Sequence, residues 1–196
     1  MSAAGVAQKV LLVSYCFDRI MVAAELCGNN QGLVKMYQPE MMKPAESAAK
    51  PVVERDTPSS AVINGNQAPG MLAAVTAADL VTQKVLDKEN DGVNIAIVSA
   101  YNTSTSSGQL AFYVERIARQ GLIGIALCNS PEFVAAAPGG NPVFGTNPLA
   151  VGIPQTGEAP FTVSRILFAK FYGSIFCSLT IIIFPYTISS IWQLLL

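Results

Sequence analysis

The sequence predicts an α/β fold in which a mixed sheet is flanked by helices. Apolar residues recur at helical spacing over residues 70–86. An apolar run at residues 93–99 is followed by a second helical pattern at residues 110–119. Two more apolar runs of strand length, residues 122–128 and 149–153, are joined by a segment rich in Pro, Gly, Asn and Ala, which predicts two core strands with a shaped loop between them.

The chain before residue 70 is expected to contribute one packing helix and two short strands. Apolar residues recur at helical spacing between residues 10 and 26, and the Gly and Asn residues at 28–30 form a stop signal. A stretch rich in Pro, Ala, Glu and Ser surrounds a strand expected at residues 52–55. A second strand is expected at residues 61–63, ending in an Asn-Gly-Asn turn.

The helix expected at residues 70–86 has one apolar side. Its stripe leaves Asp79 and Lys84 on other faces.

Composition excludes several kinds of function. The 196 residues carry 12 basic and 13 acidic side chains spread along the chain, a net charge of −1. This balance gives no basic patch of the kind that binds nucleic acid, so a nucleic-acid partner is not expected. The four cysteines are scattered without a CxxC pair and there is no His, so a metal site is not expected and the cysteines are interpreted as free thiols. The absence of His also removes the commonest general acid or base.

The segment YNTSTSSG, residues 101–108, is rich in hydroxyl groups and lies between an expected strand and an expected helix. Backbone N–H groups at a helix start, together with Ser and Thr hydroxyls, suit an anion such as a phosphate. The same hydroxyls suit a purely structural helix cap, and both interpretations stay open. Neither GxGxxG nor GxxxxGK[ST] is present, so the two common nucleotide-binding fingerprints do not apply.

The stretch GLIGIALCNSPEFVAAAPGG, followed by VFGTNPLAVGIP, resembles the malate/L-lactate dehydrogenase family of NAD(P)-dependent oxidoreductases, which includes sulfolactate and ureidoglycolate enzymes. The resemblance extends from about residue 22 to residue 162, the front half of a typical member. It implies a sulfolactate-dehydrogenase-like fold, distinct from the Rossmann fold and incomplete here. Residues 1–162 are then the N-terminal part of the oxidoreductase domain, and residues 163–196 an unrelated apolar tail.

The resemblance implies two catalytic positions. Where the family carries a Ser-His-Gly-x-x-Arg motif, this chain has Gln31 in place of His and Lys35 in place of Arg. Lys35 is expected to attract the substrate carboxylate, and Gln31 to polarise or orient the substrate oxygen, since an amide cannot titrate. A polar turn with an exposed Lys is the alternative interpretation.

The resemblance also implies two cofactor-binding segments for NAD or NADP. One is Ser106, Ser107 and Gly108, where Ser106 replaces a second family His. The other is Thr146, Asn147 and Pro148, for which the alternative is a turn whose Asn side chain satisfies local backbone. With both family histidines replaced, either the site works with hydroxyl and amide groups or catalysis has been lost.

The tail has two interpretations. Residues 171–196 contain no charged residue and are long enough to cross a bilayer, with Arg165 and Lys170 before them. Pro185 and the polar residues near it weaken this signal. The segment is either a membrane anchor, with the main body in the cytoplasm, or translated non-coding sequence.

The function expected from the resemblance is hydride transfer between NAD(P) and a small 2-hydroxy or 2-oxo acid, in a cytoplasmic homodimer. The alternative is a non-catalytic, truncated relative, either attached to a membrane through residues 171–196 or pairing with an intact paralogue.

Overall fold

The structure is a computed structural model that describes residues 19–22, 24–26, 45–87, 89, 93–137, 139–157, 159–166 and 179–185. Residues 19–22 and 24–26 are helical. The other elements, in chain order, are β1 (Val52–Asp56), β2 (Ser60–Asn64), α3 (Gly70–Leu86), β3 (Ala96–Tyr101), α4 (Leu110–Ala118), β4 (Leu122–Cys128), β5 (Glu132–Ala135), β6 (Pro142–Gly145), β7 (Pro148–Ile153), β8 (Phe161–Ile166) and β9 (Leu179–Pro185).

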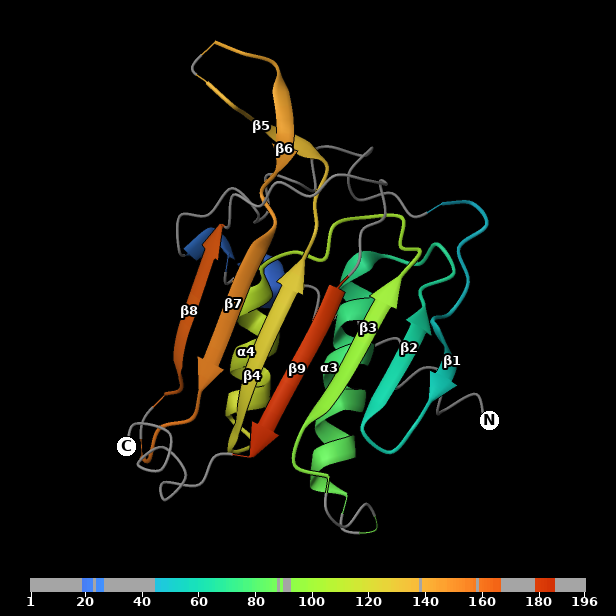
Figure 1. The fold of residues 1–196 in the computed structure, drawn as a ribbon, viewed down its shortest axis with the longest axis vertical. Coiled ribbons are helices and arrows are strands. Elements are labelled where there is room, and N and C mark those ends of the chain that lie inside the picture. The colour runs from blue at the N-terminus through green and yellow to red at the C-terminus, as the bar shows by residue number, and fades with distance from the viewer. Residues whose placement is uncertain are drawn as a thin grey trace.

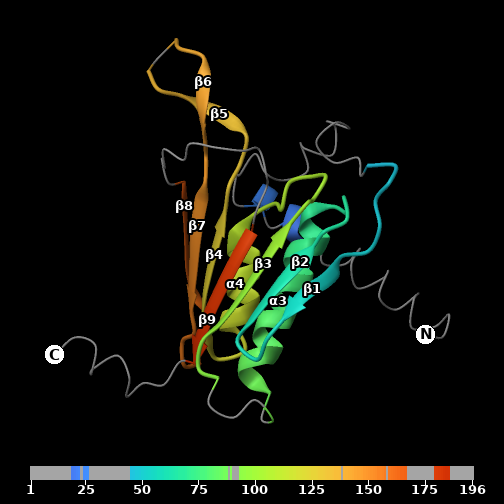
Figure 2. The same ribbon diagram turned by 45° about the vertical axis from the view of Figure 1, so that its right-hand side comes forward.

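One seven-stranded sheet forms the centre of the fold, with strand order β1-β2-β3-β9-β4-β7-β8 (Figure 1). Only β2 and β3 are a parallel pair; every other neighbouring pair is antiparallel. α3 connects β2 to β3, and α4 connects β3 to β4. Both helices lie on the same face of the sheet (Figures 1 and 2). The α/β class and the mixed sheet predicted from the sequence are therefore confirmed.

The sheet residues that face the helices are small, which brings α4 close to the strands. Ala126 and Ala150 are fully buried on this face. A Cβ on Gly124 would lie 3.1 Å from Ile117, and a Cβ on Gly152 would lie 2.4 Å from the carbonyl oxygen of Val114. Glycine is needed at residue 152 because α4 rests directly on the backbone of β7.

α3 has the bounds that the sequence predicted. Lys84, which lies off the apolar stripe, is nonetheless buried and only 7% exposed. Its Nζ donates to the carboxylate of Asp56 and, at 2.6 Å, to the carbonyl oxygen of Thr57. The β1–β2 connection reaches the end of α3 and supplies both acceptors, a non-local contact that helical spacing alone does not reveal.

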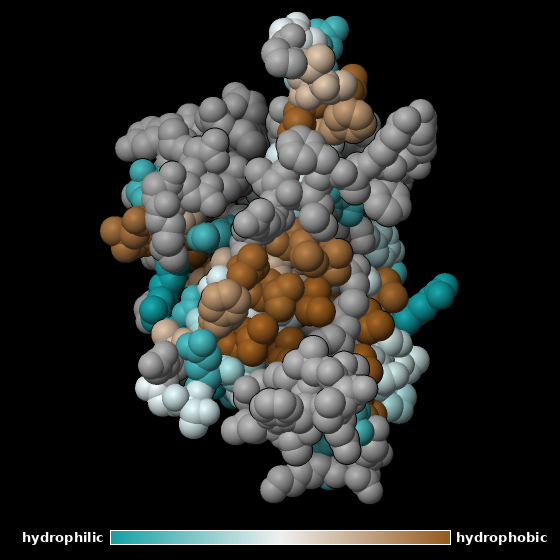
Figure 3. All heavy atoms as spheres, turned by 60° about the vertical axis from the view of Figure 1, so that its left-hand side comes forward, coloured by the Kyte–Doolittle hydropathy of each residue, from teal (hydrophilic) through white to brown (hydrophobic). Residues whose placement is uncertain are grey.

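The opposite face of the sheet is apolar and open (Figure 3). The strand register places Ile97, Ile125, Val151 and Val163 in one row across β3, β4, β7 and β8. Ile97 is 40% exposed and Phe161, on the neighbouring row, is 52% exposed. An apolar face of this kind is typical of a contact surface.

A two-stranded sheet formed by β5 and β6 projects away from the main sheet (Figures 1 and 2). The sequence predicted a shaped loop here. The backbone instead pairs in an irregular antiparallel hairpin, with register shifts on both sides of Val134. Gly139, at φ 79°, lies in the turn between the strands.

Part of the apolar tail belongs to the main sheet. β8 runs across the boundary expected after residue 162, and β9 lies between β3 and β4. Ile181 of β9 is fully buried in the core. In the described part of the chain, no helix has the length and apolar composition needed to cross a membrane. The division into a family domain and a separate tail stays a prediction.

Candidate functional site

The two expected cofactor-binding segments lie at the same end of the sheet. The loop that follows β3 contains Ser107, whose Oγ lies 3.6 Å from the Sγ of Cys128 at the end of β4. Two residues further on, the Oγ of Ser130 lies 2.8 Å from the Oγ1 of Thr146, just before β7. Residues 128–130 therefore join the two segments into one candidate site.

Hydroxyl groups in the β3–α4 loop have separate partners. Thr105 is 7% exposed, and its Oγ1 accepts a hydrogen bond from the backbone N–H of Gly70 at 3.0 Å. Ser106 Oγ accepts from the N–H of Gly108 at 3.1 Å. Thus Thr105 caps α3, which is distant in sequence, whereas the N-cap residue of α4, Gln109, makes no capping bond with its own side chain. The capping expected from sequence occurs, but at a different helix.

Close backbone packing fixes the position of this loop. A Cβ on Gly70 would lie 2.3 Å from the carbonyl oxygen of Thr105, so no larger residue fits without moving the loop. Gly108 has φ 71°, and Ile20 of the N-terminal helix lies against it. The buried Tyr113 of α4 donates its hydroxyl to the carbonyl oxygen of Ser107.

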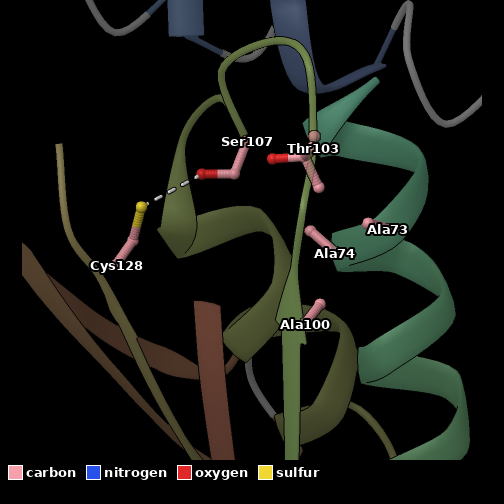
Figure 4. Close-up of a pocket in the computed structure, with 7 residues that line it drawn as sticks. Ala73, Ala74, Ala100, Thr103, Ser107 and Cys128 are labelled. Carbon is pink, nitrogen blue, oxygen red and sulfur yellow. Dashed lines mark hydrogen bonds between the residues drawn. The ribbon is translucent and has the colours of Figure 1, made fainter. Parts of the chain in front are cut away.

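A small hollow of about 10 Å³ lies between this loop, α3 and the end of β4 (Figure 4). Ala74, Ala100, Thr103 and Ser107 line it, and the Ser107 hydroxyl points toward Cys128. Gly70, Ala73 and Cys128 complete the lining. In the same loop, the Oγ of Ser104 is buried without a hydrogen-bond partner. A hollow of about 10 Å³ has room for about one water molecule, so a larger group would bind here only if the loop moved.

Sequence reasoning selected Ser107 and missed the other lining residues. Thr103 lay within the hydroxyl-rich segment and could have been included for that reason. Cys128 ends a predicted strand, beside the Asn-Ser-Pro residues that carried part of the resemblance. The alanines have no local signal, since they match the core pattern of α3 and β3.

The turn before β7 is organised by Ser130. Its Oγ accepts hydrogen bonds from the N–H of Thr146 at 2.7 Å and from that of Asn147 at 3.3 Å. In return, Asn147 Oδ1 accepts from the N–H of Ser130 at 3.0 Å. A Cβ on Gly145 would lie 2.3 Å from the Ser130 carbonyl oxygen. The Asn147 side chain therefore bonds the backbone of a residue 17 positions earlier, not the local backbone that the turn interpretation predicted, and Pro148 follows it as the first residue of β7.

A polar cluster lies at the carboxyl ends of the parallel strands β2 and β3. Asn64 Nδ2 donates to Glu54 at 2.8 Å, and the Tyr101 hydroxyl donates to the other Glu54 oxygen at 2.7 Å. Asn102 Nδ2 donates to Asn64 Oδ1 at 2.8 Å, and Gln67 donates to Asn102 Oδ1. These bonds connect both strand ends to the loop that begins α3.

The hydrogen bonds to Glu54 change its acidity. The Tyr101 hydroxyl, followed by the Asn64 amide, lowers the pKa of the Glu54 carboxyl below its ordinary value of 4.5. The Glu54 carboxylate correspondingly raises the pKa of Tyr101 above 10.0. Both shifts favour the charged carboxylate with a protonated phenol.

The contribution of Glu54 to stability is expected to depend on pH. Because its pKa is lowered in the folded state, the contribution is present above pH 4.5 and is lost as pH falls through the folded pKa. We expect Glu54→Gln to be less stable than the wild type at pH 7, and the difference to shrink between pH 5 and pH 3. Urea denaturation across this range measures it; a difference that is constant with pH would contradict the prediction. Glu46→Gln is the control for an exposed carboxylate.

The two expected catalytic residues, Gln31 and Lys35, lie outside the described residues. Within the described ranges no group of three or more Cys, Asp or Glu side chains is arranged to hold a metal ion. Cys128 forms no disulfide bond with any described residue.

Comparison with known proteins identifies the family. The malate/L-lactate dehydrogenase family matches residues 14–164, which is more than half of the chain. The chain belongs to this family. L-sulfolactate dehydrogenase of Methanothermobacter thermautotrophicus is 35% identical over 103 residues, covering 53% of this chain and 28% of that protein. The NAD(+) ureidoglycolate dehydrogenase of Escherichia coli O157:H7 is 27% identical over 160 residues, covering 80% and 44%.

Solved structures of malate dehydrogenases have a similar fold. The enzyme from Entamoeba histolytica superposes with a TM-score of 0.60 at 28% identity, covering 75% of this chain and 40% of that one. The enzyme from Pyrococcus horikoshii gives 0.61 at 28% identity, covering 74% and 41%. The chain thus spans less than half the length of these members of the malate/L-lactate dehydrogenase family.

Proposed function

We propose that this protein is an NAD(P)-dependent oxidoreductase that moves a hydride between the nicotinamide and a small 2-hydroxy or 2-oxo acid. The observation that carries the proposal is the meeting of the two family segments at one end of the sheet, joined through residues 128–130 beside the hollow. Family membership supports an oxidoreductase. Relatives include an NAD(+) ureidoglycolate dehydrogenase and an NADP(+) (2R)-3-sulfolactate dehydrogenase, which supports a nicotinamide cofactor and leaves the choice of form open.

The β3–α4 loop supports the proposal through its hydroxyl groups. The Thr103 and Ser107 hydroxyls open onto the hollow, and Ser104 Oγ is a buried polar atom without a partner. The N-cap residue of α4, Gln109, makes no capping bond with its own side chain, and a helix start of this kind suits an anionic group. Ser106 and Gly108 hold the loop in the shape that leads into this helix start.

The turn Thr146, Asn147 and Pro148 would form the other side of the cofactor site. Because Ser130 already bonds the backbone of this turn, its contribution is a rigid surface with the Thr146 hydroxyl on it. A rigid turn positions a ligand without a further loss of entropy on binding. When bound, NAD(P) supplies or accepts the hydride; the chain's own residues bind, orient and exclude water.

Substrate chemistry is assigned to Gln31 and Lys35. The Lys35 ammonium would attract the acid's carboxylate as a point charge, and the Gln31 amide would hydrogen-bond the oxygen at the reacting carbon. The chain has no imidazole, so proton transfer at that oxygen must use another group or water. This is a testable difference from a site that contains His.

Cofactor binding through the hollow is tested with Thr103→Val, which keeps the shape of the side chain and removes its hydroxyl. We expect the Kd for NADH or NADPH to rise about fivefold to tenfold, the value of one hydrogen bond to a ligand, with little change in Tm. Nicotinamide fluorescence measures binding. Thr82→Val, near the C-terminal end of α3 and outside the lining of the hollow, is the matched control. Equal affinities for the two variants would contradict the assignment of Thr103.

Turnover then separates the proposed enzyme from a non-catalytic relative. Absorbance at the nicotinamide band, followed with 2-oxo acids such as pyruvate and oxaloacetate, reports hydride transfer directly. Loss of turnover in Lys35→Met with unchanged cofactor affinity is the expected result. Cofactor binding without any turnover in the wild type would favour the non-catalytic alternative, and no binding at millimolar cofactor would refute the proposed function.

A further inference from the structure

β9 occupies a central place although it lies outside the part of the chain that matches the family. The family match ends at residue 164, and β9 begins at Leu179. It pairs antiparallel with β3 over residues 96–100 and with β4 over residues 122–128. Ile181 is fully buried, with Val98 and Ala126 as its neighbours in register. A segment beyond the family match therefore completes the core.

The sheet depends on β9 for its continuity. β3 has β2 as its other neighbour, and β4 has β7. If β9 were removed, β3 and β4 would each present an unpaired edge in the middle of the fold, and the sheet would separate into β1-β2-β3 and β4-β7-β8. Buried backbone groups without partners are costly, so this slot must be filled for the fold to be stable.

The same segment is the part of the chain with the composition of a membrane anchor. Residues 171–196 contain no charged side chain. With residues 179–185 held in the sheet, the uncharged stretch between residue 170 and the strand, 171–178, is 8 residues long. It is shorter than the roughly 18 to 20 residues that a membrane-spanning helix needs.

We propose that Leu179–Pro185 is a closing strand, and that its place in the sheet and its insertion in a membrane are mutually exclusive states of one segment. In the folded protein the strand completes the sheet, which keeps the apolar tail from spanning a bilayer. The membrane is the alternative only for chains in which the slot between β3 and β4 is empty. The proposal concerns the tail alone and is independent of cofactor binding.

A disulfide between two paired strands tests the placement of β9. Ser99 and Thr180 are partners in the β3–β9 register, so Ser99→Cys with Thr180→Cys places two thiols opposite each other. In the full chain, mild oxidation is expected to link them, as mapped by mass spectrometry, and to raise Tm by roughly 5 °C or more. The control pair is Ser99→Cys with Leu86→Cys, whose second position lies on α3, behind the sheet. A folded β3–β9 double variant that does not link, or that links no better than the control, would overturn the proposal.

Two further measurements extend the test. The linked protein is mixed with phosphatidylcholine vesicles and centrifuged in a flotation gradient, and it is expected to stay in the soluble fraction. The comparison sample is the reduced protein, unfolded before it is mixed with the vesicles. If the linked protein floats with the vesicles as this sample does, the two states are not exclusive. If the cysteine variants fail to fold, Ile181→Asp and Ile181→Val test whether β9 is part of the folded core. The Asp variant is expected to lose cooperative unfolding and the Val variant to keep it, whereas equal Tm values for both would overturn a structural role for β9.

Discussion

Gly70→Ala is expected to destabilise the protein by about 2 kcal/mol and to weaken cofactor binding at the same time. The added Cβ would lie 2.3 Å from the Thr105 carbonyl oxygen, a backbone atom that cannot rotate away. Overpacking of this kind costs about 1 to 3 kcal/mol, and the better helix propensity of Ala returns up to about 1 kcal/mol. The loop must therefore move, and it takes the Thr103 and Ser107 hydroxyls with it.

Urea denaturation and nicotinamide fluorescence measure the two effects of Gly70→Ala. Gly140→Ala is the control, because residue 140 is exposed in the β5–β6 hairpin and a Cβ there would have its nearest contact at 3.2 Å. We expect the control to change stability by no more than about 0.5 kcal/mol. A Gly70→Ala protein with wild-type stability would show that the loop does not rest on the start of α3.

Tyr113→Ala is expected to have the largest effect of any single substitution in α4, about 3 to 5 kcal/mol. Among the residues that the structure describes, Tyr113 has the largest fully buried side chain, and its ring packs edge-to-face on Phe112 with centroids 5.6 Å apart. Its hydroxyl adds a second function, because it holds the carbonyl oxygen of Ser107. One residue thus supports both the core and the candidate site.

Tyr113→Phe separates these two roles. It keeps the ring and removes the donor, so we expect a loss of about 1 kcal/mol and a weaker affinity for the cofactor. Tyr101→Phe is the control, since the Tyr101 hydroxyl bonds Glu54 at an exposed position and its removal is expected to cost less than about 0.5 kcal/mol. Identical stabilities and affinities for the two Phe variants, measured by denaturation and fluorescence, would contradict the anchoring role of Tyr113.

Local patterns were sufficient for the regular elements. The apolar stripe gave α3 the bounds Gly70–Leu86, and the apolar run between Gly121 and Asn129 gave β4 the bounds Leu122–Cys128. The strand expected at residues 93–99 lies instead at Ala96–Tyr101. Its end is set by pairing with β2 and by the hydrogen bond from Tyr101 to Glu54, neither of which is a local property.

Non-local contacts account for what the sequence did not predict. Thr105 caps a helix that begins 35 residues earlier, and Lys84 is buried by acceptors 28 and 27 residues away. A short apolar run has no period that distinguishes a central strand from a membrane segment, so β9 was not predicted. For the site, the sequence indicated the segments at residues 106–108 and 146–148; their roles, like those of Gln31 and Lys35, stay predictions.

The position of β9 has a consequence for how the chain folds during its synthesis. Val98 is made 83 residues before its partner Ile181 in the register, so the centre of the sheet is completed last. Pairing over so long a separation is slow, because loop closure is opposed by chain entropy until the contact forms. A nascent chain that has been synthesised as far as β8 presents two unpaired apolar strand edges, those of β3 and β4. Between the synthesis of β8 and that of β9, these edges are where a chaperone would bind to prevent aggregation.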